Sequence, residues 1–265
     1  MAVDVDATGA AETIAECLSL GAVGGEVAAF DVTELDAWVA LRERLERDWP
    51  RLDLLVNNAG VCMSAEVGDG GFAAWRRTIE VNYLGLLAGC HVMTPWLKAS
   101  AESSKAPSQN SQLATRNSQP PPAIINIASV TAFLPAPAMG AYASSKAAVI
   151  ALSEAMYAEL RPHGVHVTVA APGFFRTQLL DRGTFTLRRH RAQAEHLTRT
   201  AKIDARSVAR DALVASQRGR LYVVVGRRAR WLWRLKRLAP RLLFRVIASR
   251  YQRIIIRGQE CDAGD

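Results

Sequence analysis

The stretch from Ile124 to Leu160, IINIASVTAFLPAPAMGAYASSKAAVIALSEAMYAEL, decides the fold. It opens with a short apolar run, residues 124–128, in which three of five positions are isoleucine. Such a run predicts a buried strand that ends at Ser129. After a loop marked by proline and glycine comes a segment rich in Ala, Leu, Met and Glu, which favours a helix. The stretch therefore predicts a buried strand followed by a helix.

Tyr142 and Lys146 stand four residues apart near the start of this helix, so they share one helix face. An ammonium beside a phenol favours the phenolate, which brings a tyrosine toward working pH as a general acid or base. Ser129 lies at the carboxyl end of the predicted strand, where open α/β sheets bind their ligands. Because many helices carry a tyrosine and a lysine at this spacing by chance, the pair alone does not decide function.

Other motifs appear in a fixed order on either side of this stretch. The run Asn57-Asn58-Ala59-Gly60 ends the apolar strand LDLLV, and Asn82 lies in IEVNYLG. Downstream, Pro172-Gly173 ends the strand VHVTVAA and precedes Thr177. Together with the serine, tyrosine and lysine, these motifs resemble the short-chain dehydrogenase/reductase family from about residue 2 to residue 226.

The resemblance implies an α/β fold with a Rossmann-type, doubly wound parallel sheet in residues 1–226. It also implies hydride transfer between NAD(H) and a small-molecule alcohol or carbonyl substrate, without a metal. Ser129 would hold the substrate oxygen and Tyr142 would exchange the proton. Lys146 would lower the pKa of the tyrosine and bind the ribose hydroxyls, and Asn82 would hold a local helix distortion and complete the proton relay.

The resemblance further implies the cofactor contacts. Asp4 matches the acid that binds the adenosine ribose hydroxyls, with Asp6 as its rival for that role. A carboxylate there repels a 2′-phosphate and Val5 supplies no cation, so NAD is favoured over NADP. Asp31 matches the contact to the adenine amino group. The remaining implied contacts are Asn58, Ala59, Gly60, Tyr142, Lys146, Pro172, Gly173 and Thr177.

One part of the dinucleotide-binding pattern is missing. The fold begins with a strand and a glycine-rich turn that brings the pyrophosphate to a helix N-terminus. No such turn follows a predicted strand here, and Gly21, Gly24 and Gly25 lie in a helix-to-strand loop. The absent strand is central in the family, so its neighbours would lose partners at about 1–3 kcal/mol per backbone group. We expect Met1 to be a misplaced start or the sequence to be a fragment, which puts cofactor binding in question.

Three segments carry weaker signals. Residues 72–97 predict one long amphipathic helix, of a kind that pairs between subunits in the family, and thus a homodimer or homotetramer. Residues 99–122 lack periodicity and predict a flexible insertion without a catalytic role. Residues 179–200 occupy the family's mobile substrate lid. The lid mixes leucines and a phenylalanine with arginines, which indicates a hydrophobic or lipid-like substrate.

The net charge of +8 is concentrated near the C-terminus. Residues 1–187 hold 13 Lys/Arg and 19 Asp/Glu, whereas residues 188–257 hold 20 and 3. Residues 227–265 thus form a basic extension, amphipathic over 227–257, in which Pro240 should kink or divide a helix. In order of preference, it would contact an anionic membrane surface, pack on its own domain or a sister subunit, or bind nucleic acid.

The 265 residues suffice for one sizeable α/β domain with an extension. The four cysteines lack metal-ligand spacing and no signal peptide precedes them, which predicts a reduced, cytoplasmic protein. No apolar run reaches the eighteen or so residues of a membrane span. The competing hypothesis is a non-catalytic, membrane-associated or regulatory relative that cannot hold NAD.

Overall fold

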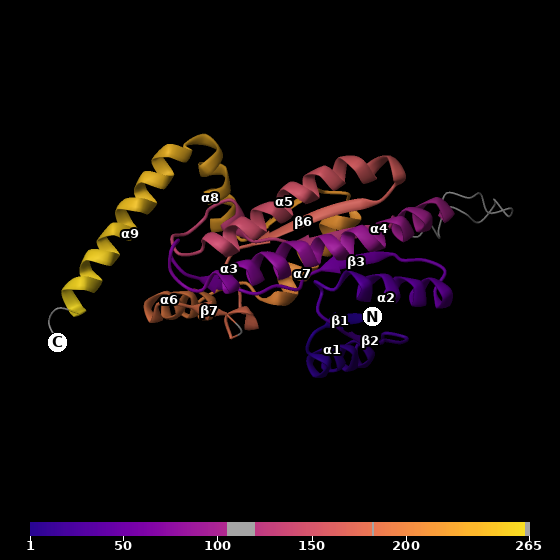
Figure 1. Cartoon of the computed structure of the whole chain (residues 1–265). Helices are drawn as coiled ribbons and strands as arrows, with labels where there is room; N and C mark the ends of the chain where they lie inside the picture. Colours follow the sequence, from indigo (N-terminus) through magenta and orange to yellow (C-terminus); the bar gives the residue numbers. More distant parts are fainter. Residues whose placement is uncertain (105–119, 182, 263–265) are drawn as a thin grey trace.

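The computed structural model describes residues 1–104, 120–181 and 183–262 (Figure 1). Its strands are β1 (Ala2–Asp4), β2 (Val27–Ala29), β3 (Leu54–Asn57), β4 (Met63–Ser64), β5 (Ala123–Ile127), β6 (His166–Pro172), β7 (Thr184–Phe185) and β8 (Tyr222–Val225). Its α-helices are α1 (Ala7–Ser19), α2 (Leu35–Asp48), α3 (Phe72–Ile79), α4 (Leu86–Ser103), α5 (Gly140–Leu160), α6 (Arg188–Arg199), α7 (Ala205–Gln217), α8 (Arg227–Leu238) and α9 (Pro240–Asp262).

The strands confirm the α/β class; those described form one four-stranded sheet and two separate pairs, β1-β2 and β4-β7. Four parallel strands follow the order β3-β5-β6-β8, and β1 pairs with β2 in a separate parallel pair. Among the described residues, no ladder joins β1 to β3, where the absent strand was expected. On one face of β3, Leu54 and Val56 are 36% and 47% exposed, whereas Leu55 on the other face is buried.

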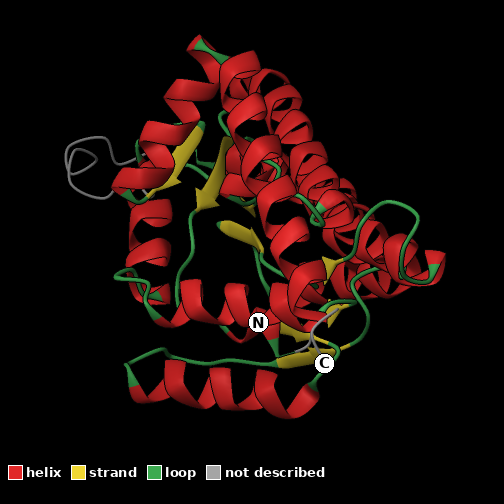
Figure 2. Ribbon diagram, turned by 90° about the vertical axis from the view of Figure 1, so that its left-hand side faces the viewer, coloured by secondary structure: helices red, strands yellow, loops and turns green. Residues whose placement is uncertain are grey.

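Helices cover the four-stranded sheet on both sides (Figure 2). Consecutive strand residues point to opposite faces, so Ile124 packs into the core shared by α2, α4 and α5, while Ile125 packs against Ala212 of α7. Both isoleucines are almost fully buried. The predicted strand at the centre of the deciding stretch is therefore enclosed on both faces.

A polar chain crosses this core between β3, β5 and α5. The side-chain amide of Asn57 donates to Oδ1 of Asn126 at 2.9 Å, and Nδ2 of Asn126 donates to Oγ of Ser153 at 2.9 Å. All three side chains are buried, so each unpaired group would cost about 1–3 kcal/mol. The chain of hydrogen bonds thus sets the position of α5 relative to the two strands.

The long helix predicted over residues 72–97 is interrupted. It consists of α3, a π-helical segment at Glu80–Gly85, and α4. Gly85 lies in tight contact with Val32, where an added Cβ would stand 2.6 Å from a methyl carbon. Asn82, in the middle of the π-helical segment, is fully buried. The local distortion expected around this asparagine is present.

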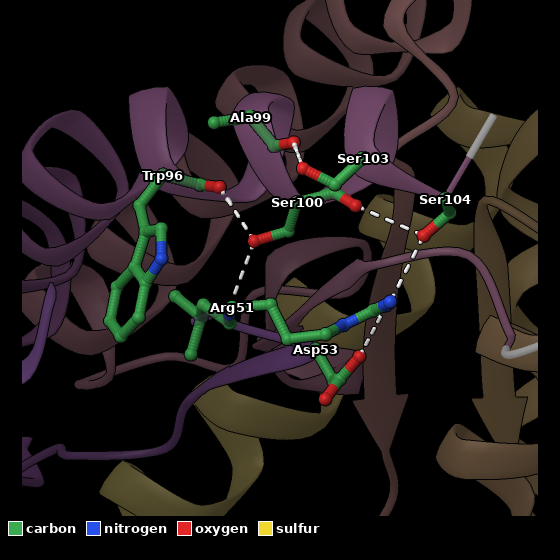
Figure 3. A network of polar contacts seen from close by, with 8 residues as sticks. Arg51, Asp53, Trp96, Ala99, Ser100, Ser103 and Ser104 are labelled. Atoms are coloured by element: carbon green, nitrogen blue, oxygen red, sulfur yellow. Dashed lines mark hydrogen bonds and ion pairs between the residues drawn. The ribbon is translucent and has the colours of Figure 1, made fainter. Parts of the chain in front are cut away.

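The boundary of the predicted insertion 99–122 is wrong at its start, because α4 continues through Ser103. The hydroxyl of Ser100 accepts from the backbone N–H of Leu52 at 2.9 Å, and Ser104 accepts from Arg51 at 3.0 Å (Figure 3). Arg51 also pairs with Asp53 at 2.5 Å. These tertiary contacts stabilise a serine-rich helix end that composition alone assigns to a loop. The rest of the predicted insertion, residues 105–119, lies outside the described residues.

Helices α8 and α9 form the C-terminal extension, and they are divided at Pro240 as predicted. Proline disfavours a helical conformation at the residue before it, which ends α8, and its fixed φ suits the first position of α9. Of the helices in the described ranges, none is both long enough and apolar enough to cross a membrane.

The buried face of α4 gives a first prediction. Leu97 is fully buried, whereas Leu84, in the preceding π-helical segment, is 45% exposed. Leu97→Ala should lower the free energy of unfolding by about 2–5 kcal/mol, through lost burial and the cavity left behind. Urea unfolding followed by circular dichroism measures this, with Leu84→Ala as the matched control. Equal losses in the two variants would contradict the described packing.

Candidate active site

The predicted catalytic residues gather at the carboxyl ends of the parallel strands. Ser129 follows β5 by two residues and begins a short 3₁₀ turn, Val130–Ala132, where its Oγ accepts from the N–H of Thr131 at 3.2 Å. Nζ of Lys146 donates to the carbonyl of Ile127 at 2.8 Å. This bond fastens the first turns of α5 to the end of β5.

Ser129 and Tyr142 are brought together, and Lys146 lies beside them. Ser129 lies close enough to Tyr142 for its side chain to affect the pKa of the phenol. Nζ of Lys146 lies 5.9 Å from the centroid of the tyrosine ring. Tyr142 and Lys146 are only 7% and 4% exposed. The arrangement therefore unites a hydroxyl pair and a cation in a site largely shielded from water.

The pKa of Tyr142 is raised, contrary to the lowering expected from Lys146. Burial is the largest cause, and the nearby Cys62 adds to it, while the side chain of Ser129 acts in the opposite direction. Burial disfavours the phenolate, and the lysine directs its hydrogen bond to the Ile127 carbonyl instead of the phenol. Burial also lowers the pKa of Lys146 to about 8.

Asn82 holds the loop that follows β3. Its Oδ1 accepts from the N–H of Val61 at 2.8 Å, and its Nδ2 donates to the Val61 carbonyl and to Oγ of Ser145, both at 3.0 Å. A Cβ added to Gly60 would stand 3.1 Å from Oδ1 of Asn82 and 3.5 Å from Nζ of Lys146. The close approach thus favours glycine at this position, and the Asn82 side chain binds the loop. The expected connection of Asn82 to the lysine stays a prediction.

Cys62 is a site residue that the sequence analysis missed. Its side chain is buried near Tyr142, and burial raises the pKa of its thiol to about 11. The carbonyl of Cys62 accepts from the N–H of Thr184, where β7 of the lid pairs with β4. The only signal in the sequence was its position two residues after the NNAG run.

The acids assigned to the adenosine end differ in their surroundings. Asp4 is exposed at the end of β1, whereas its rival Asp6 caps α1 by accepting from the N–H of Gly9 at 3.1 Å. Asp31 accepts from Thr33 and pairs with Arg77. Burial acts to raise the pKa of Asp31, but these hydrogen bonds outweigh it and lower the pKa. Asp4, whose Oδ1 accepts from the N–H of Asp6 at 2.9 Å, is the more exposed of the two candidate ribose acids.

The other assigned cofactor residues occupy the same strand edge or its loops. Asn58 and Ala59 are exposed after β3, Pro172 ends β6, and Gly173 follows it. Exposed Thr177 lines a cavity of about 510 Å³ beneath α6, in the predicted lid. Neither that cavity nor a second one of about 490 Å³ between α7, β8 and α8 is lined by the serine, tyrosine or lysine.

The residues present fit a nicotinamide cofactor in part. A hydroxyl pair with a buried cation suits the ribose and the reacting end, and the exposed Asp4 carboxylate suits ribose hydroxyls. At the pyrophosphate position, between β1 and β3, the described residues provide no glycine-rich turn. In the same ranges, no group of His, Cys, Asp and Glu side chains could hold a metal ion.

Comparison with known proteins identifies the family. The family model for short chain dehydrogenase matches residues 1–184, more than half of the chain. The chain therefore belongs to the short-chain dehydrogenase family. Trans-4-hydroxycyclohexanecarboxylate dehydrogenase of Sinomonas cyclohexanicum is 30% identical over 160 residues, covering 59% of this chain and 54% of that protein. The chain thus spans about half the length of this curated relative.

Solved structures agree with this assignment. A short chain dehydrogenase/reductase from Burkholderia phymatum in complex with NAD has a TM-score of 0.74 at 26% identity, covering 91% of this chain and 84% of that one. A gluconate 5-dehydrogenase from Burkholderia cenocepacia J2315 in complex with NADP and tartrate has a TM-score of 0.55 at 26% identity, with coverages of 67% and 62%. The Rossmann-type fold is therefore shared with cofactor-bound relatives.

The lowered pKa of Lys146 makes stability depend on pH. The folded protein releases this proton at about pH 8, and the unfolded chain near 10.5. Since the unfolded state binds more protons between these values, Lys146 contributes increasing stability as pH rises from 8 to 10.5. The free energy of unfolding of the wild type should therefore rise relative to that of Lys146→Met over this window.

Urea unfolding at several pH values from 7 to about 10 measures this difference. Lys202→Met is the matched control, because it removes the same charge from an exposed position. If the difference in free energy of unfolding between the wild type and Lys146→Met stays constant across this pH window, burial does not destabilise the Lys146 ammonium.

Proposed function

We propose that this chain is an NAD-dependent oxidoreductase that interconverts an alcohol and a carbonyl compound, with Tyr142 exchanging the proton. The observation that supports this most directly is the hydroxyl pair of Ser129 and Tyr142 with the Lys146 ammonium beside the ring. Family membership supports the class of reaction. The proposal assigns each of these side chains one step.

In carbonyl reduction, the substrate oxygen would accept hydrogen bonds from Ser129 and Tyr142 and then take the phenolic proton. The bound cofactor supplies the hydride to the substrate carbon. Alcohol oxidation reverses both transfers. A buried phenol with a raised pKa is protonated at neutral pH, which suits donation to a carbonyl. The neighbouring ammonium favours the phenolate that donation leaves behind.

NAD is the proposed cofactor, and NADP is the second choice. Relatives in the same fold bind one or the other. The exposed carboxylate of Asp4 would bind ribose hydroxyls and repel a 2′-phosphate. Lys146 would bind the other ribose, and Thr177 would lie near the carboxamide. Asp31 is proposed to contact adenine, although its carboxylate is already engaged by Thr33 and Arg77.

The proposed substrate is hydrophobic or lipid-like. The lid contains β7 and α6. Strand β7 pairs with β4, which follows the loop after β3. Half-buried Leu179, Leu180 and Phe185 accompany the arginines of this segment. A homodimer or homotetramer, measurable by light scattering, and a cytoplasmic location are part of the same proposal.

Replacing the proton-exchanging group tests the mechanism. Tyr142→Phe should lower turnover by about 10²–10⁴-fold, the usual contribution of a positioned acid or base, with NADH production followed over a panel of apolar secondary alcohols. Tyr157→Phe is the matched control on the same helix, where the phenol pairs with Arg161 instead. Full turnover by Tyr142→Phe would refute the assignment.

A second candidate is a non-catalytic family member that does not hold NAD. The separation of the β1-β2 pair from β3 favours it, because the pyrophosphate would bind between them. NADH titration by fluorescence discriminates between the two functions. Saturable binding in the micromolar range supports the oxidoreductase, and absence of binding to the folded chain supports the second candidate.

A further inference from the structure

The extension formed by α8 and α9 concentrates positive charge. Between Arg227 and Arg253 the sequence holds ten Lys/Arg and no Asp/Glu. Leaving aside Arg228, whose side chain is not among those described, no described ion pair joins a cation of this segment to a carboxylate. The charge is therefore available for an anionic partner.

Large apolar side chains stand exposed among these cations. Trp231 is 62% exposed and Leu238 84% exposed on α8, and seven residues of separation place them on one helix face. Leu242, 61% exposed, begins α9 on the far side of Pro240. In Figure 1 the corner between α8 and α9 stands out from the layered body. Such interleaving of cations with exposed apolar groups is typical of helices that lie in a membrane interface.

Other faces of the extension fasten it to the domain. The ring of Trp233 lies 5.6 Å from Phe133 and 5.9 Å from Tyr222, and Ala229 is buried. Farther along α9, the hydroxyl of Tyr251 donates to Glu66 at 2.5 Å. The exposed residues therefore face outward on an anchored element, so they need no unfolding to reach a surface.

A basic cavity lies next to this corner. It measures about 490 Å³ between α7, β8 and α8. One carboxylate, Asp211, lines it, at 3.5 Å from Arg210. Guanidinium groups suit phosphate because two parallel N–H donors of one group can bind two phosphate oxygens at once. The other cations lining the cavity are Arg220, Arg230 and Arg234, with the Trp233 ring beside them.

We propose that the α8–α9 corner and this cavity bind a membrane surface that contains anionic phospholipid. Trp231, Leu238 and Leu242 enter the headgroup layer, while Arg230 and Arg234 meet lipid phosphates. The inference uses none of the residues assigned to catalysis and stands whether or not the chain turns over a substrate. Nucleic acid is the weaker candidate partner, because contacts to its phosphates would not involve the three exposed apolar side chains.

Vesicle sedimentation with the full chain tests this, at about 0.1 M salt, where surface charges act over roughly 10 Å. Vesicles of phosphatidylcholine alone are compared with vesicles holding equal amounts of phosphatidylcholine and phosphatidylglycerol. Binding to the anionic vesicles should be at least about tenfold tighter. Arg230→Gln/Arg234→Gln, and separately Leu238→Ser/Leu242→Ser, should each weaken it about tenfold.

The matched control is Arg44→Gln/Arg47→Gln, which removes two arginines from α2, where Arg47 is exposed and Arg44 is half-buried beside Glu26, and it should leave binding unchanged. Circular dichroism of each variant verifies that its helices are retained. Equal affinity for the two vesicle types, or an equal loss in the control, would overturn the proposal. So would tighter binding to a DNA duplex at the same salt. A change of oligomeric mass in Leu238→Ser/Leu242→Ser without loss of vesicle binding would assign the corner to a subunit contact.

Discussion

Asn126 is fully buried in β5, and its side-chain amide must find partners inside the protein. It finds Asn57 on β3 and Ser153 on α5. Lys146 and Tyr142 precede Ser153 by seven and eleven residues, or about two and three helical turns, so all three share one helix face. The buried amide therefore sets the rotation of α5, which in turn sets where the phenol and the ammonium meet Ser129, three residues beyond Asn126.

A second constraint acts from the other side of the site. The π-helical segment changes the helical phase at Asn82. The side-chain amide of Asn82 forms hydrogen bonds with both the N–H and the carbonyl of Val61. Because Gly60 has no side chain, the loop after β3 approaches both Asn82 and Lys146 closely. The loop, the π-helical segment and α5 are thereby held in one arrangement. π-Bulges often occur at functional sites, and here the distortion has a visible structural task.

Much of the site could be predicted from local patterns. Helix spacing placed Tyr142 and Lys146 on one face, and the apolar run placed Ser129 at a strand end; the family resemblance then joined the three into one site. Cys62 escaped prediction because its proximity to Tyr142 depends on tertiary packing. The raised pKa of Tyr142 likewise depends on burial, which opposes the effect expected from the lysine.

The fold, too, has features that follow from local sequence and features that depend on tertiary contacts. The break at Pro240 follows from the backbone chemistry of proline. The continuation of α4 through Ser103 depends on Arg51 and Leu52, about fifty residues earlier in the chain, which no local pattern of serines reveals. The π-helical segment was expected only through the family resemblance, because residues 72–97 have uniform helical periodicity.

The division of the sheet affects how the molecule can open. The unit β1–α1–β2 shares no ladder with β3 in the described ranges, and side chains such as Val3 and Ala28 connect it to the larger sheet by packing against the shared core. Backbone amides in such a peripheral unit exchange with solvent through local openings, whereas those in β5 and β6, paired on both sides, require disruption of the whole core. The N-terminal unit, with Asp4 at its strand end, should therefore behave as a foldon of its own, and a ligand that spans both units would gain part of its effect by coupling their stabilities.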